Sequence, residues 1–337
     1  AGRKNLIING GFDVWQRGTS NTTVATPMLL ADRMNCRAGT GSTHTVEKST
    51  DVPTTGESSF TNSLKFTVGA TAAAIATTTG NNYFDYRIEG YDSAHIRQGT
   101  AYAKTVTLSF WVKSSVAGAY GLNLGKDTTY CYATSYTINS ANTWEKKTIT
   151  IPGTSLGGGS WNTSNGTGIR IFWNWGAGSN YTSGSVGWAT ADDRGGYDDG
   201  SAVQLVANAN ATWYITGIQL ELGSVATDFE HRSYGEELAL CQRYYQKISG
   251  TYPASTFSTA RADSQISFPE MRVSPTIDGT PTFAVVYFAG SSYTGGTWAS
   301  NGATTVSITI WNGGLSGVTA GQGGWLNGLN LKLKAEL

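Results

Sequence analysis

The sequence predicts an all-β protein whose antiparallel strands form a sandwich or a barrel. Most segments alternate apolar and polar residues with a period of two, which is typical of strands that bury one face. The stretches between them are rich in Gly, Ser, Thr and Asn, the residues that turns favour. Only one segment has the spacing of a helix. Many short strands joined by such turns are characteristic of antiparallel sandwiches and barrels.

Four segments in the first two-thirds of the chain show the strand pattern: Lys104–Ser114, Lys146–Ile151, Gly168–Trp175 and Thr212–Leu222. In the third of these, Trp173 and Trp175 alternate with polar residues and share a face with two isoleucines, so we expect both indoles in the core. Gly217 interrupts the fourth segment. A glycine inside a strand predicts a bulge or a close backbone approach.

The exceptional segment is Ser233–Lys247, whose apolar positions recur at spacings of three, four and three. Those spacings predict a helix with the stripe Leu238, Cys241, Tyr245 and Ile248. Ser233 and Glu236 fit a capping box, in which each side chain bonds the backbone N–H of the other. Gly250 is a suitable stop. We therefore expect a connecting helix over 233–250, between a first domain at 1–232 and a second at 251–337.

The residues after this helix return to the strand pattern, and they carry very few charges. Domains of this size have modest cores and often gain stability by association. The second domain is therefore expected to be an oligomerising part or a tip. Its expected strands are Gln265–Phe268, Thr282–Phe288, Thr304–Trp311 and Leu326–Leu337.

The composition is poor in charge and rich in glycine and aromatic residues. Charged residues make up 14% of the 337 residues, against roughly 25% in an average soluble domain. The aromatic content argues against disorder, and the scarcity of Glu, Lys and Arg argues against a coiled coil. Because 23 basic and 23 acidic residues cancel, no excess of positive charge is available for nucleic acid.

The three cysteines, Cys36, Cys131 and Cys241, are odd in number and far apart. That pattern is typical of free thiols in a chain made in a reducing cytoplasm. No run reaches the roughly 18 apolar residues of a membrane helix, so we expect no membrane insertion. The first residues lack the pattern of a secretory signal.

Several anchors carry a resemblance to known families. Asn5–Arg17 (NLIINGGFDVWQR) resembles the first strand of carbohydrate-binding-module-type jelly rolls, and Thr107–Ser115 and Thr216–Arg232 fit the same pattern. More narrowly, the chain resembles phage virion proteins, chiefly tail-fibre and head- or tail-appendage proteins. That second likeness rests on the closing strand together with Ala31-Asp32-Arg33, Ser233–Tyr245 and Phe268–Pro275.

The resemblance implies a jelly-roll sandwich on a virion appendage, often trimeric and often facing a host-surface glycan. It covers residues 5–275 at scattered positions. The sequence has no coiled-coil or repeat shaft, which favours a short appendage docked on another virion protein over a long fibre.

A group of aromatic residues is the first candidate site. Flat rings stack on the C–H faces of sugars, while amides and carboxylates bond the hydroxyl groups. The loop Gly176–Gly200 and its surroundings are otherwise Gly, Ser, Thr and Asn, which predicts a carbohydrate platform there. For Trp161, Tyr181 and Trp188 the alternative of a packed side chain stays open. The candidate residues are Trp161, Asn180, Tyr181, Trp188 and Tyr197.

Two places are candidates for a structural Ca²⁺, a cation that takes six to eight oxygen ligands. Residues 192–200 hold four carboxylates around two glycines, including Asp192 and Asp198, although a solvated turn explains the same residues. The second place follows from the resemblance alone. Jelly-roll modules often hold an ion between the opening motif and the closing strand, which here implies Asp13 with Gln219 or Glu221.

Catalysis has little support in the sequence. The three histidines lie in no metal-binding motif, and no Gly-x-Ser-x-Gly elbow is present. Asp85, Glu89 and Asp92 contain the carboxylates that glycoside hydrolysis requires, but side chains at such spacings also form ordinary salt links in sheets.

We therefore expect a non-enzymatic structural subunit of a phage virion, a fibre or appendage of the head or tail. It would be exposed on the virion surface, made in the cytoplasm of a bacterial host, and assembled as a homotrimer with other virion proteins. Contact with host-surface polysaccharide is part of this hypothesis. Two alternatives are a purely architectural adaptor that binds only virion proteins, and a glycan-degrading enzyme on the same sandwich.

Overall fold

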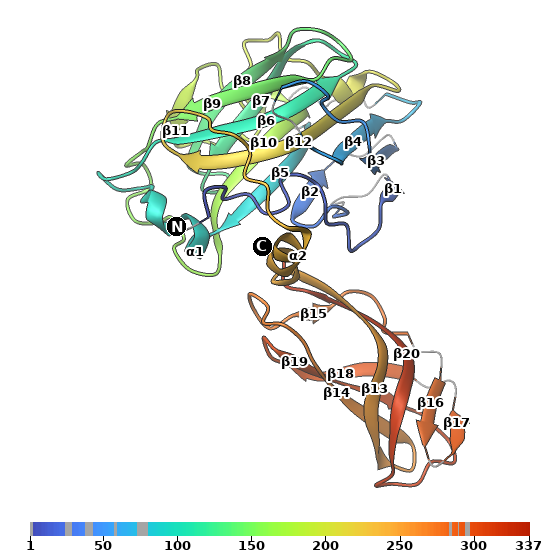
Figure 1. Ribbon diagram of the computed structural model, residues 1–337. Helices are drawn as coiled ribbons and strands as arrows, with labels where there is room; N and C mark the ends of the chain where they lie inside the picture. Colours follow the sequence, from blue (N-terminus) through green and yellow to red (C-terminus); the bar gives the residue numbers. More distant parts are fainter. Residues whose placement is uncertain are drawn as a thin grey trace. The chain divides into compact units, whose positions relative to one another are not determined.

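The computed structural model divides the chain into two compact units (Figure 1). The first unit comprises Ala1–Glu237 together with Leu337, and the second comprises Leu238–Glu336. The structure describes residues 3–23, 29–37, 43–56, 59–72, 80–282, 285–288, 290–293 and 297–337. The predicted fold class, a jelly-roll sandwich followed by a short helix and smaller β structure, is confirmed.

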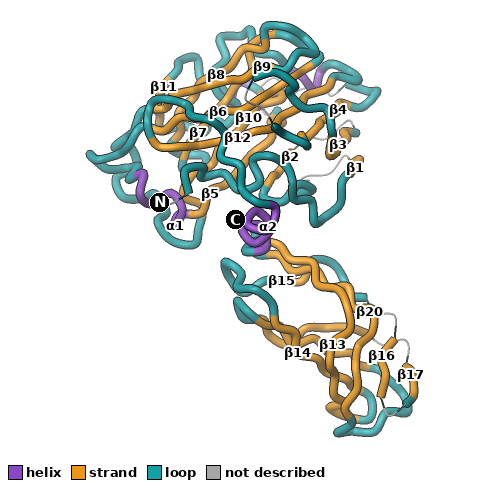
Figure 2. The backbone as a smooth tube through the Cα atoms, viewed as in Figure 1, coloured by secondary structure: helices purple, strands orange, loops and turns teal. Residues whose placement is uncertain are grey.

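Two six-stranded antiparallel sheets form the first unit (Figure 2). Sheet A has the order β1 (Ser20–Thr23), β3 (His44–Ser49), β4 (Ser63–Val68), β12 (Thr212–Leu222), β6 (Val106–Ser114) and β9 (Glu145–Ile151). Sheet B has the order β11 (Gly187–Ala189), β8 (Cys131–Ile138), β7 (Gly118–Gly125), β10 (Thr167–Ala177), β5 (Asn81–Glu89) and β2 (Met34–Arg37). Short helical segments occur at α1 (Gly90–Ser93), η1 (Ala94–Ile96), η2 (Ser179–Tyr181) and η3 (Leu205–Ala207).

The inner faces of the two sheets meet in one aromatic-rich core. As predicted, the alternating apolar residues of β6 and β10 are buried, Trp173 and Trp175 included. The Trp175 indole stacks on Phe66 with 3.8 Å between ring centroids, and it meets Trp213 edge-on at 5.4 Å. Trp175 on β10 belongs to sheet B, whereas Phe66 and Trp213 belong to sheet A. These ring contacts therefore pack the two sheets against each other.

Gly217 causes both of the features predicted for it. The register of β12 with β6 shifts between Thr216 and Gln219, which marks a bulge. The φ angle of Gly217 is 62°, and a Cβ built there would lie 2.4 Å from Cζ of Phe60. Only glycine fits this backbone without displacing the phenyl ring.

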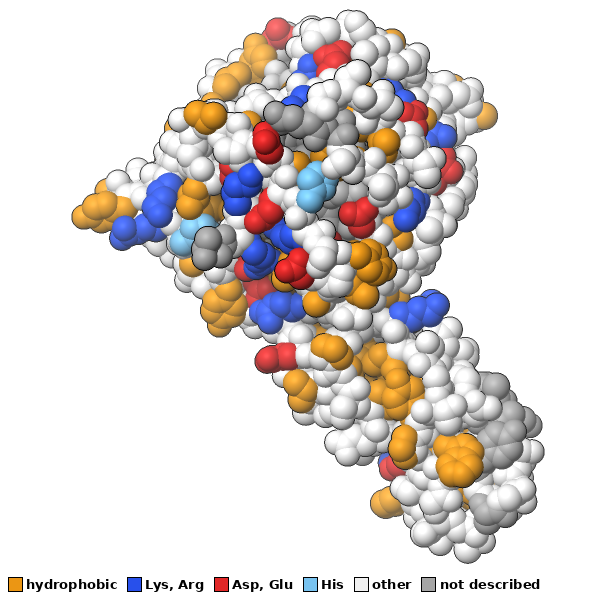
Figure 3. All heavy atoms as spheres, viewed as in Figure 1, with side chains coloured by type: hydrophobic (Ala, Val, Ile, Leu, Met, Phe, Trp, Pro, Cys, Tyr) orange, Lys and Arg blue, Asp and Glu red, His pale blue; other side chains and the backbone are white. Residues whose placement is uncertain are grey.

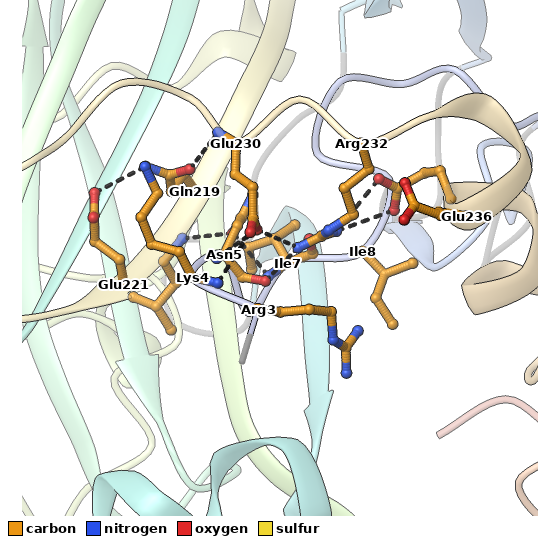
Figure 4. Close-up of polar contacts among 12 residues, drawn as sticks. Arg3, Lys4, Asn5, Ile7, Ile8, Gln219, Glu221, Glu230, Arg232 and Glu236 are labelled. Atoms are coloured by element: carbon orange, nitrogen blue, oxygen red, sulfur yellow. Dashed lines mark hydrogen bonds and ion pairs between the residues drawn. The ribbon is translucent and has the colours of Figure 1, made fainter. Parts of the chain in front are cut away.

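The opening and closing segments of the first unit are fastened to each other (Figure 4). The Asn5 amide donates to the carbonyl of Ile218 at 3.0 Å, and its oxygen accepts the N–H of Leu220 at 3.1 Å. Arg232 donates to the carbonyl of Ile7 at 3.1 Å and to the carboxylate of Glu230 at 2.9 Å. The sequence anchors at 5–17 and 216–232 therefore form one hydrogen-bonded clasp.

The helix after the clasp is α2 (Tyr234–Gln242), and it begins as predicted. Ser233 Oγ accepts the N–H of Glu236 at 3.3 Å, and the Glu236 carboxylate accepts the N–H of Ser233 at 3.0 Å, which completes the capping box. The predicted extent of 233–250 is wrong, because the chain enters a strand at Tyr245. Tyr245 and Ile248 are buried there as strand residues.

The second unit is one eight-stranded antiparallel sheet with its own core. Along it run β17 (Ser291–Tyr293), β16 (Val285–Phe288), β20 (Gly323–Lys334), β13 (Tyr245–Ser258), β14 (Arg261–Ser267), β19 (Ser307–Gly313) and β18 (Thr297–Ala303), and β15 (Thr276–Ile277) pairs with β20. Leu329, Leu331 and Leu333 of the predicted last strand all face the core. Residues 283 and 284 of the predicted strand Thr282–Phe288 lie outside the described residues.

Within the part of the chain that the structure describes, no helix is long and apolar enough to cross a bilayer.

Candidate functional site

A small surface pocket opens at one end of the sandwich, where the turn after β5 meets the segment before β10. Its walls include Ser93, Arg97, Gln98, Trp161, Asn162 and Thr163. Two backbone bonds hold the two segments together, from the N–H of Gly90 to the carbonyl of Gly166 and from the N–H of Tyr91 to the carbonyl of Ser164, both at 2.8 Å. The pocket is therefore bounded by backbone that is fixed on both sides.

Trp161 forms the back of this pocket. Its indole N–H donates to the carbonyl of Leu156 at 2.9 Å, and only 6% of the residue is exposed. A Cβ built on Gly99 would lie 2.4 Å from Cδ1 of the indole, so glycine is required for this close approach. Of the two alternatives left open for Trp161, the structure shows the packed one, since the side chain belongs to the core while it also lines the pocket.

Two tyrosines beside the pocket are the most exposed aromatic residues of the sandwich. Tyr91 is 63% exposed and Tyr102 is 70% exposed. Tyr91 belongs to the α1 turn, whose Ser93 lines the pocket, and Tyr102 lies under the guanidinium of Arg97, with 4.7 Å from Cζ to the ring centroid. Neither ring lines the pocket itself, and Tyr102 is connected to it through the contact with Arg97.

The Arg97 side chain is exposed to solvent. Its φ angle of 62° is unusual for a non-glycine residue, and strained backbone of this kind is concentrated at functional sites. Its guanidinium makes no hydrogen bond or ion pair with any residue that the structure describes, apart from its contact with the Tyr102 ring. The five N–H donors of Arg97 are therefore available to a ligand.

Two other polar side chains of the pocket, Gln98 and Asn162, are hydrogen-bonded to the protein. Gln98 accepts the N–H of Thr154 at 3.0 Å and donates to the carbonyl of Lys104 at 3.4 Å. Asn162 accepts the N–H of Ser164 at 2.8 Å. These bonds fix the walls, so a ligand would be recognised mainly through Arg97 and the aromatic rings.

The aromatic residues predicted to form one platform at the loop Gly176–Gly200 lie in separate places. Trp188 is half-buried, donates to the carbonyl of Pro152 at 2.8 Å, and meets the Trp161 ring edge-on at 6.0 Å. Asn180 is exposed in η2, and Tyr181 and Tyr197 are half-buried elsewhere in the loop. The structure therefore brings Trp161 and Trp188 together, and within the described residues no ring contact joins either of them to Tyr181 or Tyr197.

That loop lies across the outer face of sheet B. The Asn123 amide of β7 donates to the carbonyl of Asp193 at 2.8 Å, and the N–H of Tyr197 donates to Thr134 of β8 at 2.9 Å. Burial, together with the charge of Asp192, raises the pKa of Asp193. The loop is thus packed against the sheet, with Tyr181 under the Arg194 guanidinium at 4.9 Å.

Two of the three carboxylates considered for catalysis, Asp85 and Asp92, form salt links. Asp85 on the outer face of β5 is fully buried, and Arg170 Nε donates to it at 2.8 Å. Asp92 accepts a hydrogen bond from Arg3 at 2.7 Å. Neither group has the unpaired setting of a general acid or base.

The donors predicted for calcium also have protein partners. Asp13 accepts from the Asn62 amide at 2.9 Å, and Gln219 donates to Glu221 at 2.9 Å (Figure 4). Asp192 binds the Arg194 guanidinium with both oxygens, and Asp198 accepts the N–H of Gly200 at 2.7 Å. Among the described residues, no three acidic, Cys or His side chains are grouped as a metal site would require. Calcium binding at either place stays a prediction.

Sequence patterns missed Arg97, Tyr91 and Tyr102. The only signal was that two tyrosines flank a short turn-rich stretch, Tyr91–Tyr102, after a strand. The pocket itself depends on a second segment more than 60 residues later in the chain, since Arg97 and Trp161 both line it. No local pattern encodes that meeting.

Comparison with known proteins shows weak structural likenesses. No family model and no curated protein matches the sequence. The arabinose-bound α-L-arabinofuranosidase MgGH51 is 13% identical with a TM-score of 0.34, and the enzymatically active domain of bacteriophage CBA120 tailspike protein 4 is 14% identical with a TM-score of 0.32. Each match covers 65% of this chain, but only 26% and 21% of those two proteins.

The carbohydrate-binding module TmCBM61, solved with β-1,4-galactotriose, is 9% identical with a TM-score of 0.31, and the match covers 66% of this chain and all of that module. At TM-scores below 0.5, these likenesses carry no argument about ligand or activity.

Proposed function

We propose that this chain is a non-enzymatic subunit of a phage virion appendage whose sandwich binds host-surface glycans at the pocket beside Arg97. The observation that carries the glycan part is the contact of exposed Tyr102 with the unpaired Arg97 guanidinium, at the edge of a pocket that Trp161 lines. A second exposed ring, Tyr91, lies on the α1 turn, whose Ser93 also lines the pocket. This set offers ring faces for sugar C–H groups and N–H donors for sugar hydroxyls. Fixed walls reduce the entropy lost on binding.

The proposed absence of catalysis is supported by the ion pairs of two acidic residues, Asp85 and Asp92. The Asp85 carboxylate is buried and bonded to Arg170, and Asp92 is paired with Arg3. A glycosidase needs two carboxyl groups that can exchange protons with the substrate.

The virion part of the proposal rests on the resemblance of the closing strand and α2 to phage appendage proteins. We propose a homotrimer that docks on other virion proteins at the virion surface. The purely architectural alternative has the same assembly but no glycan contact, so glycan binding separates the two.

Glycan binding is tested by presenting the full chain to an array of bacterial surface polysaccharides. Tyr91→Ala and Tyr102→Ala are each expected to weaken binding about tenfold, which corresponds to about 1.4 kcal/mol. Arg97→Ala should weaken it further. Tyr234→Ala is the matched control, because Tyr234 is also 61% exposed but lies on α2.

Retention of full binding by the Tyr91→Ala/Tyr102→Ala double variant would contradict the assignment of the pocket. Binding to no polysaccharide would favour the architectural alternative. Release of reducing ends from a bound polysaccharide would instead identify an enzyme. The solution mass tests the trimer, which is expected at three times 35.7 kDa.

A further inference from the structure

The second unit carries an aromatic surface that the pocket in the first unit does not explain. We propose that the outer face of its sheet is a separate binding surface for an uncharged glycan. It is formed by Phe257 and Trp311, which both contact the Arg261 guanidinium, by Arg261 itself, and by the exposed indole of Trp325. We call these four residues the outer-face cluster. The inference does not depend on the pocket beside Arg97.

The three stacked residues are held in a fixed order. The register of β13 with β14 shifts between Thr256 and Ser258, and the side chain of Phe257 at this bulge is 71% exposed. The Arg261 guanidinium lies between two rings, 4.9 Å from the centroid of Phe257 and 4.7 Å from that of Trp311. A bulge of this kind re-aims a side chain and is common at functional sites.

Asp263 orients the guanidinium within the stack. It accepts from Arg261 Nε at 2.6 Å and from Nη2 at 2.8 Å, so both carboxylate oxygens are used. This two-point pairing fixes the plane of the guanidinium and cancels its charge. The guanidinium between the two rings is therefore fixed in one orientation, and its pair with Asp263 carries no net charge.

Gly313 controls the position of the Trp311 ring. A Cβ built at Gly313 would lie 2.6 Å from Cζ3 of the Trp311 indole. The indole therefore lies over the backbone of its own strand, where a larger residue would push it away. A flat ring resting on a sheet is the geometry that stacking on a sugar requires.

Trp325 extends the cluster across the sheet. It is 56% exposed on β20, opposite Pro253 of β13. Pro253 is itself an exposed apolar neighbour, and on the same two strands Thr251 donates to the Asn327 amide oxygen at 3.0 Å. Figure 3 shows hydrophobic side chains set among uncharged polar ones over this unit, with few charged side chains in view.

This chemistry favours a glycan over a protein partner. Protein interfaces have a continuous apolar centre, whereas here a guanidinium lies between the Phe257 and Trp311 rings. On the same face, Ser255, Gln265 and Thr309 offer polar groups that can bond hydroxyl groups. Residues 251–267 and 297–329 contain no charged residue except Arg261 and Asp263, which neutralise each other. An ionic sugar would find no unpaired counter-charge, so we infer a neutral one.

The test uses the full chain carrying Tyr91→Ala and Tyr102→Ala, so that the first-unit pocket contributes as little as possible. The probes are neutral hexasaccharides of glucose, galactose, mannose and N-acetylglucosamine, titrated by calorimetry. At least one should bind, and Trp311→Ala and Trp325→Ala should each lower its association constant about tenfold. Gly313→Ala should have a similar effect, since it displaces the indole without removing it.

Val306→Ala is the matched control, because Val306 is an exposed apolar residue of the same unit in the turn before β19. It should bind as well as the starting chain. Failure of all four hexasaccharides to bind, or equal binding by the Trp311→Ala variant, would overturn the inference. A fall in solution mass caused by Trp311→Ala or Trp325→Ala would also overturn it, by identifying the face as an interface between copies.

Discussion

At the scale of single residues, His44 gives the sandwich a dependence on pH. His44 is buried on β3, and its ring stacks on Phe66 with 5.2 Å between centroids. Burial lowers the pKa of the imidazole below its ordinary value of 6.5. The folded chain therefore keeps His44 neutral at a pH where the unfolded chain binds a proton.

The sign of the effect follows from this difference. Below pH 6.5 the unfolded state holds more protons, so the free energy of unfolding falls as the pH is lowered towards the folded-state pKa. Chemical denaturation at pH 7.5 and pH 5.5 should show this loss, and His44→Gln should reduce it. His231→Gln, at an exposed position, is the control. An unchanged pH dependence in the His44 variant would contradict the prediction.

Gly217 offers a second test at this scale. Gly217→Ala would place a Cβ 2.4 Å from Phe60 in a backbone with φ of 62°. We expect the free energy of unfolding of the first unit to fall by about 2 kcal/mol or more. Gly184→Ala, where a Cβ meets nothing within 4 Å, should be nearly neutral in the same urea titration. Equal stability of the two variants would argue against the steric role of Gly217.

At the scale of elements, the capping box sets the start of α2. Ser233→Ala removes the oxygen that accepts the N–H of Glu236, and losing such a cap costs about 1 kcal/mol. Hydrogen exchange at the amides of Glu236 and Glu237 should accelerate roughly fivefold, which is that energy expressed as a ratio. Ser233→Asp should preserve protection, because Asp also caps helices. If Ala and Asp exchange equally fast, the cap is not what orders this turn.

The elements also show what the sequence could predict. Strand positions such as those of β6 and β10 were predictable because a period of two places every second side chain in the core. The start of α2 was predictable from two residues, whereas its end was not. Tyr245 and Ile248 continue the helical spacing in the sequence, but both residues belong to β13, which pairs with β20.

The candidate site was less predictable than the strands. Trp161 was identified as an aromatic residue of interest, but its burial depends on the space left by Gly99, more than sixty residues earlier. Arg97 lines a pocket only because η1 and the residue after it lie against the segment around Asn162. Contacts between distant segments are set by tertiary packing, which no local pattern records.

At the scale of the whole chain, the pocket beside Arg97 and the outer-face cluster have low charge in common. The pocket presents one unpaired guanidinium and two tyrosines, and the outer-face cluster is neutral. With only 14% charged residues, encounter with a partner gains little from electrostatic steering. Binding at either surface should therefore depend weakly on salt, as expected for sugar hydroxyls and ring faces.

The two units have separate hydrophobic cores, and among the described residues none belongs to both clusters. We therefore predict two unfolding transitions in a calorimetric scan of the full chain. Leu331→Ala, at a fully buried position of β20, should lower the transition of the second unit by about 2–5 kcal/mol in free energy and leave the other in place. Ile171→Ala, on β10, should affect only the first unit. A single transition that both variants lower equally would contradict the prediction, because it would mean that the two cores unfold as one cooperative structure.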